Sequence, residues 1–571
     1  MKSVTYRWQY AKNMILGGAQ MRGKMGRIVS GIVCTAMLGG FLIGCSDNAG
    51  NAGEMRSASN DGSGKETQLL DGGVTNATGY PIAASPITLN VGIVYGAHMG
   101  DFTKYDIWKK IEEKTNIKIN LKVYSDVEKV NLMFSSRDYP DIILRMDSAP
   151  QAISDAVDAQ DIVSINDLLK YAPNWGKFFE SNLDLKQQAL MPDGKLYGFP
   201  FALIDEYSYN LRDQWFINRK WLDELGLKIP TTTEEFKNVL TAFKENAGKG
   251  SIPKNATPYY IQYGSNIGGQ FDMYASFGVY APGSYFIVED GKFKSQATNP
   301  DLKEPIRYLA DLYKNGLIVP EAFTDDWGKY TAAISSNPPM IGSMTSYNDQ
   351  NEGYKDGKWW YPMAPLQSPN GKQPNIRRQT RSIWPRNFVI FKNNKYPVAS
   401  ARLADMLAEP DWSMMMNYGK EGVAWTKGAD GKYQLTNQKI EADADKGLAN
   451  YGIALLDENM FKNKIVNANV NKEGTREWAY DNIYKKYLPA KNLNYPPVPA
   501  GLLKDTEKLR MADLDKAIND YIKTTIANWI SGKGNVDTEW DAYVKKLQSL
   551  GLDEFMQLNQ KQLDAAAKLG K

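Results

Sequence analysis

ITLNVGIVYGAHMGDFTKYDIWKKIEEKTNIKINLKVY, residues 87–124, decides the fold. Apolar residues alternate at the start and again at the end of this stretch, which is the period of a half-buried strand. Between the two runs, Ile107, Trp108 and Ile111 occur at helical spacing. A second helical pattern and a short apolar run follow in residues 127–146. This β-α-β-α-β order predicts the α/β class, with a mainly parallel sheet covered by helices on both faces.

Polar loops follow the predicted strands, and ligands of such sheets bind beyond the carboxyl ends of the strands. The first strand continues into YGAHMGDF, and the third continues into RMDSAPQ. From these ends we expect Tyr95, Asp147 and Ser148 to contact a ligand. His98 lies in the first loop, where a ligand contact and an ordinary surface position are equally consistent with the sequence.

Composition excludes several classes of site. The chain has 571 residues, enough for two or more lobes. Both cysteines, Cys34 and Cys45, lie near the amino terminus, so the body can hold neither a disulfide framework nor a cysteine metal site. With one histidine, a zinc site would lack its usual imidazole ligands, and a serine–histidine triad would depend on that single residue.

Charge gives no reason to expect a nucleic-acid partner. The whole chain carries 68 basic and 65 acidic residues, and six of the basic residues fall within residues 1–44, which contain no acids. Without that segment, 62 basic residues face 65 acidic ones, a net charge of about −3. A near-neutral body gives no overall electrostatic case for nucleic-acid binding.

The amino terminus has the pattern of an export signal. Basic residues precede the apolar run of residues 28–44, which is shorter than the roughly 20 residues of a stable membrane-spanning helix. Residues 42–45, LIGC, resemble the bacterial lipobox, in which the cysteine is acylated and the chain is cut before it. We therefore expect Cys45 to carry the lipid (a palmitate-type acyl chain), and translation to begin at Met21 or Met25.

A segment rich in Gly, Ser, Asn and Asp separates this signal from the body. Residues 45–85 contain too little apolar surface to form a packed core. They are predicted to be a flexible tether between the lipid and the folded lobes.

Five stretches resemble, in order, the extracellular solute-binding proteins of ABC importers, in the sugar-binding branch that includes maltose-binding and alginate-binding proteins. The most specific is FIN followed by ELGLKIPTTTEEF, which looks like the strand, helix end and "xLGLxxPxTxxEF" turn of that family. The others are SSRDYPDIIL, LADLYKNGLIVPEAF, VIFKNNKYPVASARLADMLAEPD and MNYGKEGVAWT. Together they cover about residues 87–560.

The resemblance implies a two-lobed periplasmic-binding-protein-like fold of type II, which closes over its ligand by a hinge between the lobes. It divides the chain into a leader and signal peptide (1–44), a tether (45–85), lobe one and lobe two. Lobe one would comprise residues 86–203 and 361–430. Lobe two would comprise residues 204–360 and 431–571.

Arginines and aromatics near the predicted lobe crossings are candidate ligand contacts. In IRRQTRSIWPRN, residues 376–387, Arg378, Trp384 and Arg386 would share one face if a single strand ran through them. Arginine binds carboxylates or sugar hydroxyls, and tryptophan stacks on sugar rings, so this reading predicts a ligand with some acidic character. Structural ion pairs on a solvated edge are the equally weighted alternative. Three further aromatics lie near predicted crossings or strand ends: Tyr207, Tyr209 and Tyr347.

Carboxylate pairs and a calcium loop are two other candidate site types. Pairs such as Asp205 and Glu206 could serve a glycosidase, but with 65 acids such pairs arise by coincidence, and surface charge or hydroxyl binding explains them. Some relatives carry an EF-hand-like loop after the EEF helix. Here the sequence KENAGKGSIPKNATPYY offers only Glu245 as a charged ligand, so no calcium is expected there, although carbonyl ligation elsewhere stays open.

These observations predict a lipid-anchored substrate-binding protein on the extracellular face of a bacterial membrane. It would capture an oligosaccharide between its lobes and deliver it to the transmembrane permease subunits of an ABC importer, as a monomer, without cofactor, metal or catalysis. No GxxxxGK[ST] motif is present, so ATP hydrolysis would belong to another subunit. The alternatives are a surface polysaccharide-active enzyme and an adhesin or peptide-binding surface protein.

Overall fold

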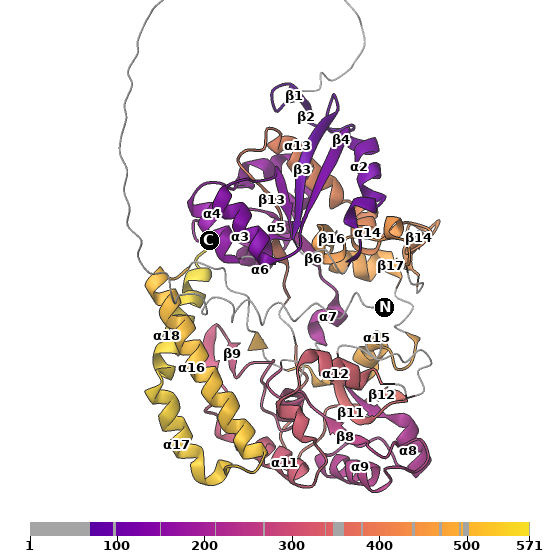
Figure 1. Ribbon diagram of the computed structural model, residues 1–571, viewed down its shortest axis with the longest axis vertical. Coiled ribbons are helices and arrows are strands. Elements are labelled where there is room, and N and C mark those ends of the chain that lie inside the picture. The colour runs from indigo at the N-terminus through magenta and orange to yellow at the C-terminus, as the bar shows by residue number, and fades with distance from the viewer. Residues whose placement is uncertain are drawn as a thin grey trace, which may run out of the picture.

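The chain forms two lobes of helix and sheet that lie one above the other (Figure 1). Within the residues that the computed structural model describes, no helix is both long and apolar enough to cross a membrane. These residues are 69–94, 99–148, 150–211, 213–265, 269–336, 338–346, 359–378, 381–436, 440–466, 471–489, 493–494 and 502–569.

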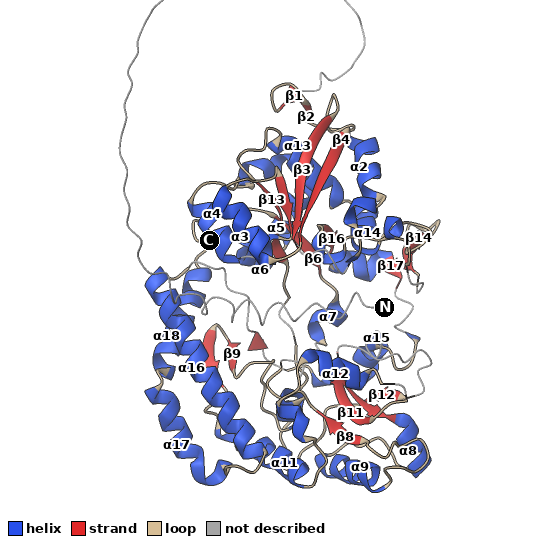
Figure 2. Cartoon of the chain, in the orientation of Figure 1, coloured by secondary structure: helices blue, strands red, loops and turns tan. Residues whose placement is uncertain are grey.

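The first lobe is built on a six-stranded sheet with helices on both faces (Figure 2). Across the sheet the strands are β16 (Ala454–Leu456), β6 (Phe199–Leu203), β13 (Trp384–Ile390), β5 (Ile142–Leu144), β3 (Ile87–Val94) and β4 (Ile117–Tyr124). The surrounding helices are α2 (Ile107–Thr115), α3 (Val127–Ser136), α4 (Pro150–Asp158), α5 (Pro173–Ser181), α6 (Leu183–Ala189), α13 (Pro397–Leu407) and α14 (Pro410–Tyr418).

Both faces of this sheet are buried, as the sequence pattern indicated. Along β5, Ile142 and Leu144 face one hydrophobic core, while Ile143 between them faces a second core on the opposite side. Such alternation between two apolar cores gives the continuous apolar run typical of a strand covered by helices on both faces.

The second lobe is built on a four-stranded sheet. Across this sheet the strands are β12 (Trp360–Pro362), β7 (Gln214–Asn218), β11 (Ile341–Ser346) and β8 (Thr257–Tyr260). Its helices include α8 (Arg219–Leu225), α9 (Thr233–Glu245), α10 (Gln270–Ser276), α11 (Lys303–Lys314) and α12 (Trp327–Ile334). The predicted start of α9 is confirmed, because Thr232 and Glu235 form a capping box and Phe236, Leu240 and Phe243 are buried.

Three carboxyl-terminal helices run along one side of the second lobe (Figure 1). They are α16 (Asp505–Ile530), α17 (Val536–Ser549) and α18 (Leu552–Ala566), and they share one hydrophobic core with that lobe. Beyond α18 the chain reaches the first lobe, where the side-chain amide of Gln187 donates to the carbonyl of Leu569 at 3.4 Å.

Three small sheets complete the described strands. One joins β10 (Lys292–Ser295), β9 (Phe286–Glu289) and β18 (Leu493–Asn494), and another joins β14 (Trp425–Lys427), β15 (Tyr433–Leu435) and β17 (Ile465–Val466). The third pairs β1 (Leu69–Leu70) with β2 (Thr75–Asn76).

The α/β class is confirmed, and the pairing within each sheet is mixed. β3 pairs in parallel with β4 and β5, but β13 is antiparallel to both β5 and β6. In the four-stranded sheet of the second lobe, β11 is parallel to β8, whereas β7 is antiparallel to both β11 and β12. The antiparallel strands are the ones that the chain enters after crossing from the other lobe, and nothing in their own apolar pattern specifies direction.

Two of the predicted boundaries between the lobes differ from those in the structure. β12, placed in lobe one by the division at residue 361, pairs with β7 in the second lobe. β16, placed in lobe two with residues 431–571, pairs with β6 in the first lobe, because the chain returns there before reaching the carboxyl-terminal helices. The sequence contained no composition change that marks either point.

The end of the predicted tether is folded. Residues 69–86, which we call the N-terminal strap, lie at the end of the first lobe remote from the second (Figure 1). The carboxylate of Asp71 accepts hydrogen bonds from the backbone N–H groups of Val398 (3.2 Å) and Ala399 (2.9 Å) in the first turn of α13. Ile82 is fully buried in the core of the first lobe. The prediction of a flexible tether is therefore wrong for residues 69–85, whereas residues 45–68 lie outside the described chain.

A buried carboxylate on α13 makes the stability of the first lobe depend on pH. Asp405 accepts hydrogen bonds from the backbone N–H groups of Asn174 (2.7 Å) and Trp175 (3.4 Å). Burial raises the pKa of Asp405 to about 6, although these hydrogen bonds act in the opposite direction. A raised carboxyl pKa favours the folded state below the unfolded pKa of about 3.9, and this contribution is lost as pH rises through about 6.

We therefore expect the stability of the wild type, relative to Asp405→Asn, to fall by about 2–3 kcal/mol between pH 4 and pH 7. Urea unfolding of both proteins across this pH range measures the difference. Asp537→Asn is the control, because Arg307 lowers the pKa of Asp537 and the exposed pair should give a small change of opposite sign. A difference between the wild type and Asp405→Asn that stays constant with pH contradicts the prediction.

Candidate ligand-binding site

Three chain segments connect the lobes, and they identify the sheet edges that face each other. Crossing one, residues 204–213, connects β6 to β7 and contains α7 (Glu206–Asn210), which lies between the lobes (Figure 1). Crossing two, residues 363–383, connects β12 to β13. Crossing three, residues 457–504, connects β16 to α16. The facing edges are therefore the end of β6 with the start of β13, and the start of β7 with the end of β12.

The three crossings pack together into one hydrophobic cluster. Leu211 of crossing one, Ile376 of crossing two and Tyr480 of crossing three are all buried in it. The N–H of Ile376 donates to the carbonyl of Tyr487 at 3.0 Å, so crossings two and three are also hydrogen-bonded. This cluster, which we call the hinge cluster, makes the connection between the lobes a single packed unit.

A buried ion triad fixes crossing two to the second lobe. The guanidinium of Arg377, 1% exposed, contacts Asp213 of crossing one at 2.6 Å and Asp272 of α10 at 2.7 Å. Burial acts to lower the pKa of Arg377, but the two carboxylates outweigh it and raise the pKa above its usual value. Arg377 therefore stays charged and serves the architecture of the hinge.

At the edge of the first lobe, the structure brings together three of the predicted residues. Asp147 follows β5, and its carboxylate accepts a hydrogen bond from the N–H of Arg386 at 2.7 Å and pairs with its guanidinium at 3.0 Å. Trp384 begins β13, and its ring centroid lies 5.8 Å from that of Phe201 in β6. The backbone of Ser148 belongs to the same turn, Met146–Ser148.

Arg145 joins this edge, although sequence reasoning did not single it out. Its guanidinium carbon lies 4.9 Å from the ring centroid of Trp384 and 4.0 Å from that of Tyr451. It has a left-handed backbone conformation, with φ of 60°, directly after β5. A bulky residue in this region is strained, and such strain concentrates at functional sites. Its position at the end of a predicted strand was the only signal in the sequence.

Three further predicted residues, Tyr207, Tyr209 and Arg378, form a second group around α7. Tyr209 donates to Glu458 at 3.3 Å and Tyr207 donates to Asp481 at 3.4 Å. Burial, followed by the charge of Glu458, raises the pKa of Tyr209 above its usual value, so its hydroxyl stays protonated at neutral pH. Arg378 of crossing two donates from Nε to the side-chain oxygen of Asn210 at 3.0 Å.

Arg378, Trp384 and Arg386 do not share one strand. β13 begins only at Trp384, and Arg378 remains in crossing two. The physical reason is the neighbouring Arg377, whose buried pairs with Asp213 and Asp272 hold this part of the chain against the second lobe.

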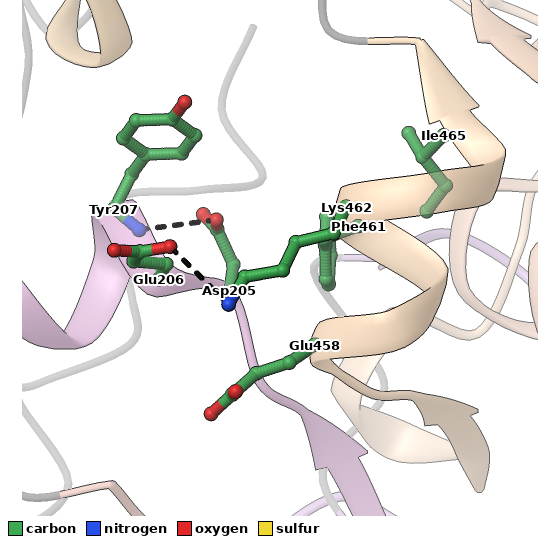
Figure 3. A pocket seen from close by; sticks show the side chains of 7 residues that line it. All are labelled: Asp205, Glu206, Tyr207, Glu458, Phe461, Lys462 and Ile465. Atoms are coloured by element: carbon green, nitrogen blue, oxygen red, sulfur yellow. Dashed lines mark hydrogen bonds and ion pairs between the residues drawn. The ribbon is translucent and has the colours of Figure 1, made fainter. Parts of the chain in front are cut away.

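A cavity of about 290 Å³ lies where crossing one meets crossing three. Figure 3 shows Asp205, Glu206 and Tyr207 on one side of it and a turn of crossing three on the other. The ammonium group of Lys462 lies 3.7 Å from a carboxylate oxygen of Glu206. The lining is Asp205, Glu206, Tyr207, Glu458, Phe461, Lys462 and Ile465. Two aromatic rings beside several carboxylates can contact the apolar faces and the hydroxyls of a sugar.

The loop after α9, where the family resemblance places a calcium-binding segment, is closed by a carboxylate from α8. The carboxylate of Glu224 accepts hydrogen bonds from the backbone N–H (2.8 Å) and hydroxyl (2.9 Å) of Ser251, so it is occupied in closing this loop. Within the described ranges, no group of three or more His, Cys, Asp or Glu side chains is placed to hold a metal ion. Cys45, Tyr95, His98 and Tyr347 lie outside the described residues, as does the side chain of Ser148.

Residues 106–430 match the family model described as "Bacterial extracellular solute-binding protein". The chain belongs to this family. The predicted family is thus confirmed, and the two lobes joined by three crossings are the architecture of a solute-binding protein.

This solute-binding protein is similar to proteins with known ligands. FusA, the fructooligosaccharide ABC transporter substrate-binding protein of Streptococcus pneumoniae, is 28% identical over 477 residues, which cover 80% of this chain and 86% of FusA. The structure of FusA in complex with kestose has a TM-score of 0.70 at 25% identity, covering 84% of this chain and 99% of that structure.

Two further similar proteins have lower sequence identity to this chain. The polygalacturonan/rhamnogalacturonan-binding protein YtcQ of Bacillus subtilis is 22% identical over 348 residues, covering 58% of this chain and 66% of YtcQ. An extracellular solute-binding protein of Bifidobacterium longum subsp. infantis has a TM-score of 0.72 at 22% identity, covering 85% of this chain and 99% of that chain, and shows the same fold.

Three arginines of the stretch 376–387 pair with carboxylates. Arg386 pairs with Asp147, and Arg377 pairs with Asp213 of crossing one and with Asp272 of the second lobe. Arg381 pairs with Asp184 at 2.9 Å and with Glu458 at 3.0 Å. An acidic ligand would have to compete with these carboxylates for each guanidinium.

Proposed function

We propose that this solute-binding protein captures a neutral oligosaccharide between its lobes for an ABC importer. Trp384, with Arg145 beside it, supplies a flat platform for a sugar ring on the edge of the first lobe. The ligand is proposed to be neutral because Arg377, Arg381 and Arg386 already pair with carboxylates of the protein. The similarity to FusA, which binds fructooligosaccharides, supports the same ligand class.

The cavity beside α7 adds to the argument for a neutral ligand. It is lined by three carboxylates, from Asp205, Glu206 and Glu458, and by the ammonium group of Lys462, while Glu458 also pairs with Arg381. A uronic acid placed there would meet like charge in a partly desolvated environment, which is unfavourable. Hydroxyl groups of a neutral sugar can instead donate to these carboxylates.

Ligand capture would use the hinge cluster as its pivot. A ligand that contacts the edges of both lobes binds the closed arrangement more tightly than the open one, and this differential affinity shifts the equilibrium toward closure. The closed protein would then dock on the transmembrane permease subunits, while a lipid on Cys45 holds it, as a monomer, at the extracellular face of the membrane. No bond of the ligand is broken in this function.

Thermal unfolding with two trisaccharides tests the proposal. Kestose is expected to raise the unfolding temperature in a concentration-dependent manner, because a ligand that binds only the folded state stabilises it. Trigalacturonic acid, which represents the acidic ligands of YtcQ, is expected to have little effect. Stabilisation by the acidic sugar alone would overturn the neutral class, and product formation from either sugar would favour the enzyme alternative.

A further inference from the structure

The edge of the second lobe that faces the first carries a row of polar side chains. β7 begins at Gln214 directly after crossing one, and β11 ends at Ser346, its antiparallel partner. On the other side, β11 pairs in parallel with β8, with Met344 opposite Tyr260. Gln262 lies two residues beyond Tyr260, just as Ser346 lies two residues beyond Met344, so the two residues follow this paired position in the same direction. Gln214 and Ser346 are therefore paired in the sheet, and Gln262 lies just beyond the end of the neighbouring strand β8.

All three side chains lie on one face of the sheet. Each is two residues from a member of the same hydrophobic core, namely Phe216, Met344 and Tyr260, and residues of equal parity along a strand share a face. The row is the polar end of this face, at the edge from which crossings one and two leave. It is removed from bulk water, since Gln214 is 1% exposed and Gln262 is 7% exposed.

Gln214 has both of its amide atoms buried without a hydrogen-bond partner among the described residues. The side-chain oxygen of Gln262 is in the same state, while its nitrogen donates to the carbonyl of Asp325 at 3.2 Å. A buried polar group without a partner costs stability, so such groups in a protein call for an explanation. Leucine or methionine at position 214 would fit an apolar core at lower cost.

We propose that Gln214, with Gln262 two strands away, is the hydroxyl-binding point that the second lobe contributes to the ligand site. This proposal rests on the proposed function. An amide offers one acceptor oxygen and two N–H donors, and a sugar hydroxyl can both donate and accept, so the two groups match. The hydrogen bonds form only when the ligand lies against both lobes, and they therefore favour the closed arrangement over the open one.

A neutral ligand fits this row better than a charged one. Gln214 and Gln262 carry no charge. The carboxylate of Asp325, whose backbone carbonyl accepts from Gln262, accepts a hydrogen bond from the hydroxyl of Tyr260, and the carboxylate of Asp213, the residue before Gln214, pairs with Arg377. Discrimination by hydrogen bonding to hydroxyls is strong, because a ligand that lacks the group leaves the buried amide unpaired. The row would thus select sugars with a hydroxyl at one defined position.

Calorimetric titration of Gln214→Met with the neutral trisaccharide kestose tests the inference. We expect the dissociation constant to rise about 10- to 100-fold, because the hydrogen bonds to the ligand are lost. The unfolding temperature without ligand should stay the same or rise, because the variant removes an unpaired buried amide. This combination separates ligand binding from a structural role, which would lower the unfolding temperature instead.

Gln560→Met is the matched control. Gln560 lies on α18 and its amide bonds to Gly291 and Phe293, remote from the crossings, so this variant should bind kestose as tightly as the wild type. Gln214→Leu is measured alongside, so that the result does not depend on how one side chain packs. Unchanged affinity in both Gln214 variants would mean that the amide holds only a buried water, which overturns the inference and leaves the proposed function intact. A wild type that binds no saccharide overturns the proposed function, and this inference with it.

Discussion

Replacing Arg377 with methionine is expected to lower the free energy of unfolding by about 3–5 kcal/mol. The guanidinium is buried between Asp213 and Asp272, and its removal leaves two carboxylates facing each other with much of their water excluded. Such an uncompensated buried charge costs far more than the intact pair contributes. Urea unfolding of the variant and of the wild type at pH 7 measures the loss.

Arg381→Met provides the control for that experiment, since it lies four residues away and also pairs with two carboxylates. Arg381 is 26% exposed and its partners Asp184 and Glu458 are more exposed still, so its loss should cost no more than about 1 kcal/mol. Equal losses in the two variants would show that burial of the triad has no special role.

Truncating Trp384 to alanine is expected to weaken oligosaccharide binding at least about 100-fold, which corresponds to about 2.7 kcal/mol. The indole packs on Phe201 and holds the guanidinium of Arg145 near its ring. The variant therefore loses the stacking surface for the sugar and the neighbour that positions Arg145. Calorimetric titration with kestose gives the affinity, and far-UV circular dichroism verifies the fold.

A second tryptophan separates ligand stacking from a general effect of losing an indole. Trp359 precedes β12 at the end of the second sheet away from the crossings, and it too has a cation over its ring, Lys220 at 4.2 Å. Trp359→Ala should leave the dissociation constant within about twofold of the wild type. If both variants weaken binding equally, the edge of the first lobe is not the stacking surface.

The elements whose burial repeats with a regular period could be predicted from the sequence. The alternating residues of β3 and β4, and the capped start of α9, appear in the structure where their patterns placed them. These patterns are local, because each depends on residues a few positions apart. Strand direction and the return of β16 to the first lobe depend on contacts between distant segments, and no local pattern encodes them.

The candidate site was predictable in part. Asp147 was predicted from its position after a strand, and Trp384 and Arg386 from a shared strand face that was wrongly extended to Arg378. The structure brings Asp147 beside Arg386, because the end of β5 and the start of β13 meet at this edge. The charge state of the site was not predictable, since a run of arginines looks the same whether its partners are ligand groups or distant carboxylates. Asp184, Asp213 and Asp272 lie 105 to 197 residues from the arginines that they neutralise.

The N-terminal strap has a mechanical consequence for a protein held at a membrane. A pull on the amino terminus is transmitted through Asp71 to α13, and thus to the first lobe alone. Under the proposed attachment at Cys45, only residues 46–68 span the distance to the lipid, at most about 80 Å when fully extended. The first lobe is then the one held near the membrane. The second lobe, which carries the three long carboxyl-terminal helices, moves relative to it when the protein opens and closes.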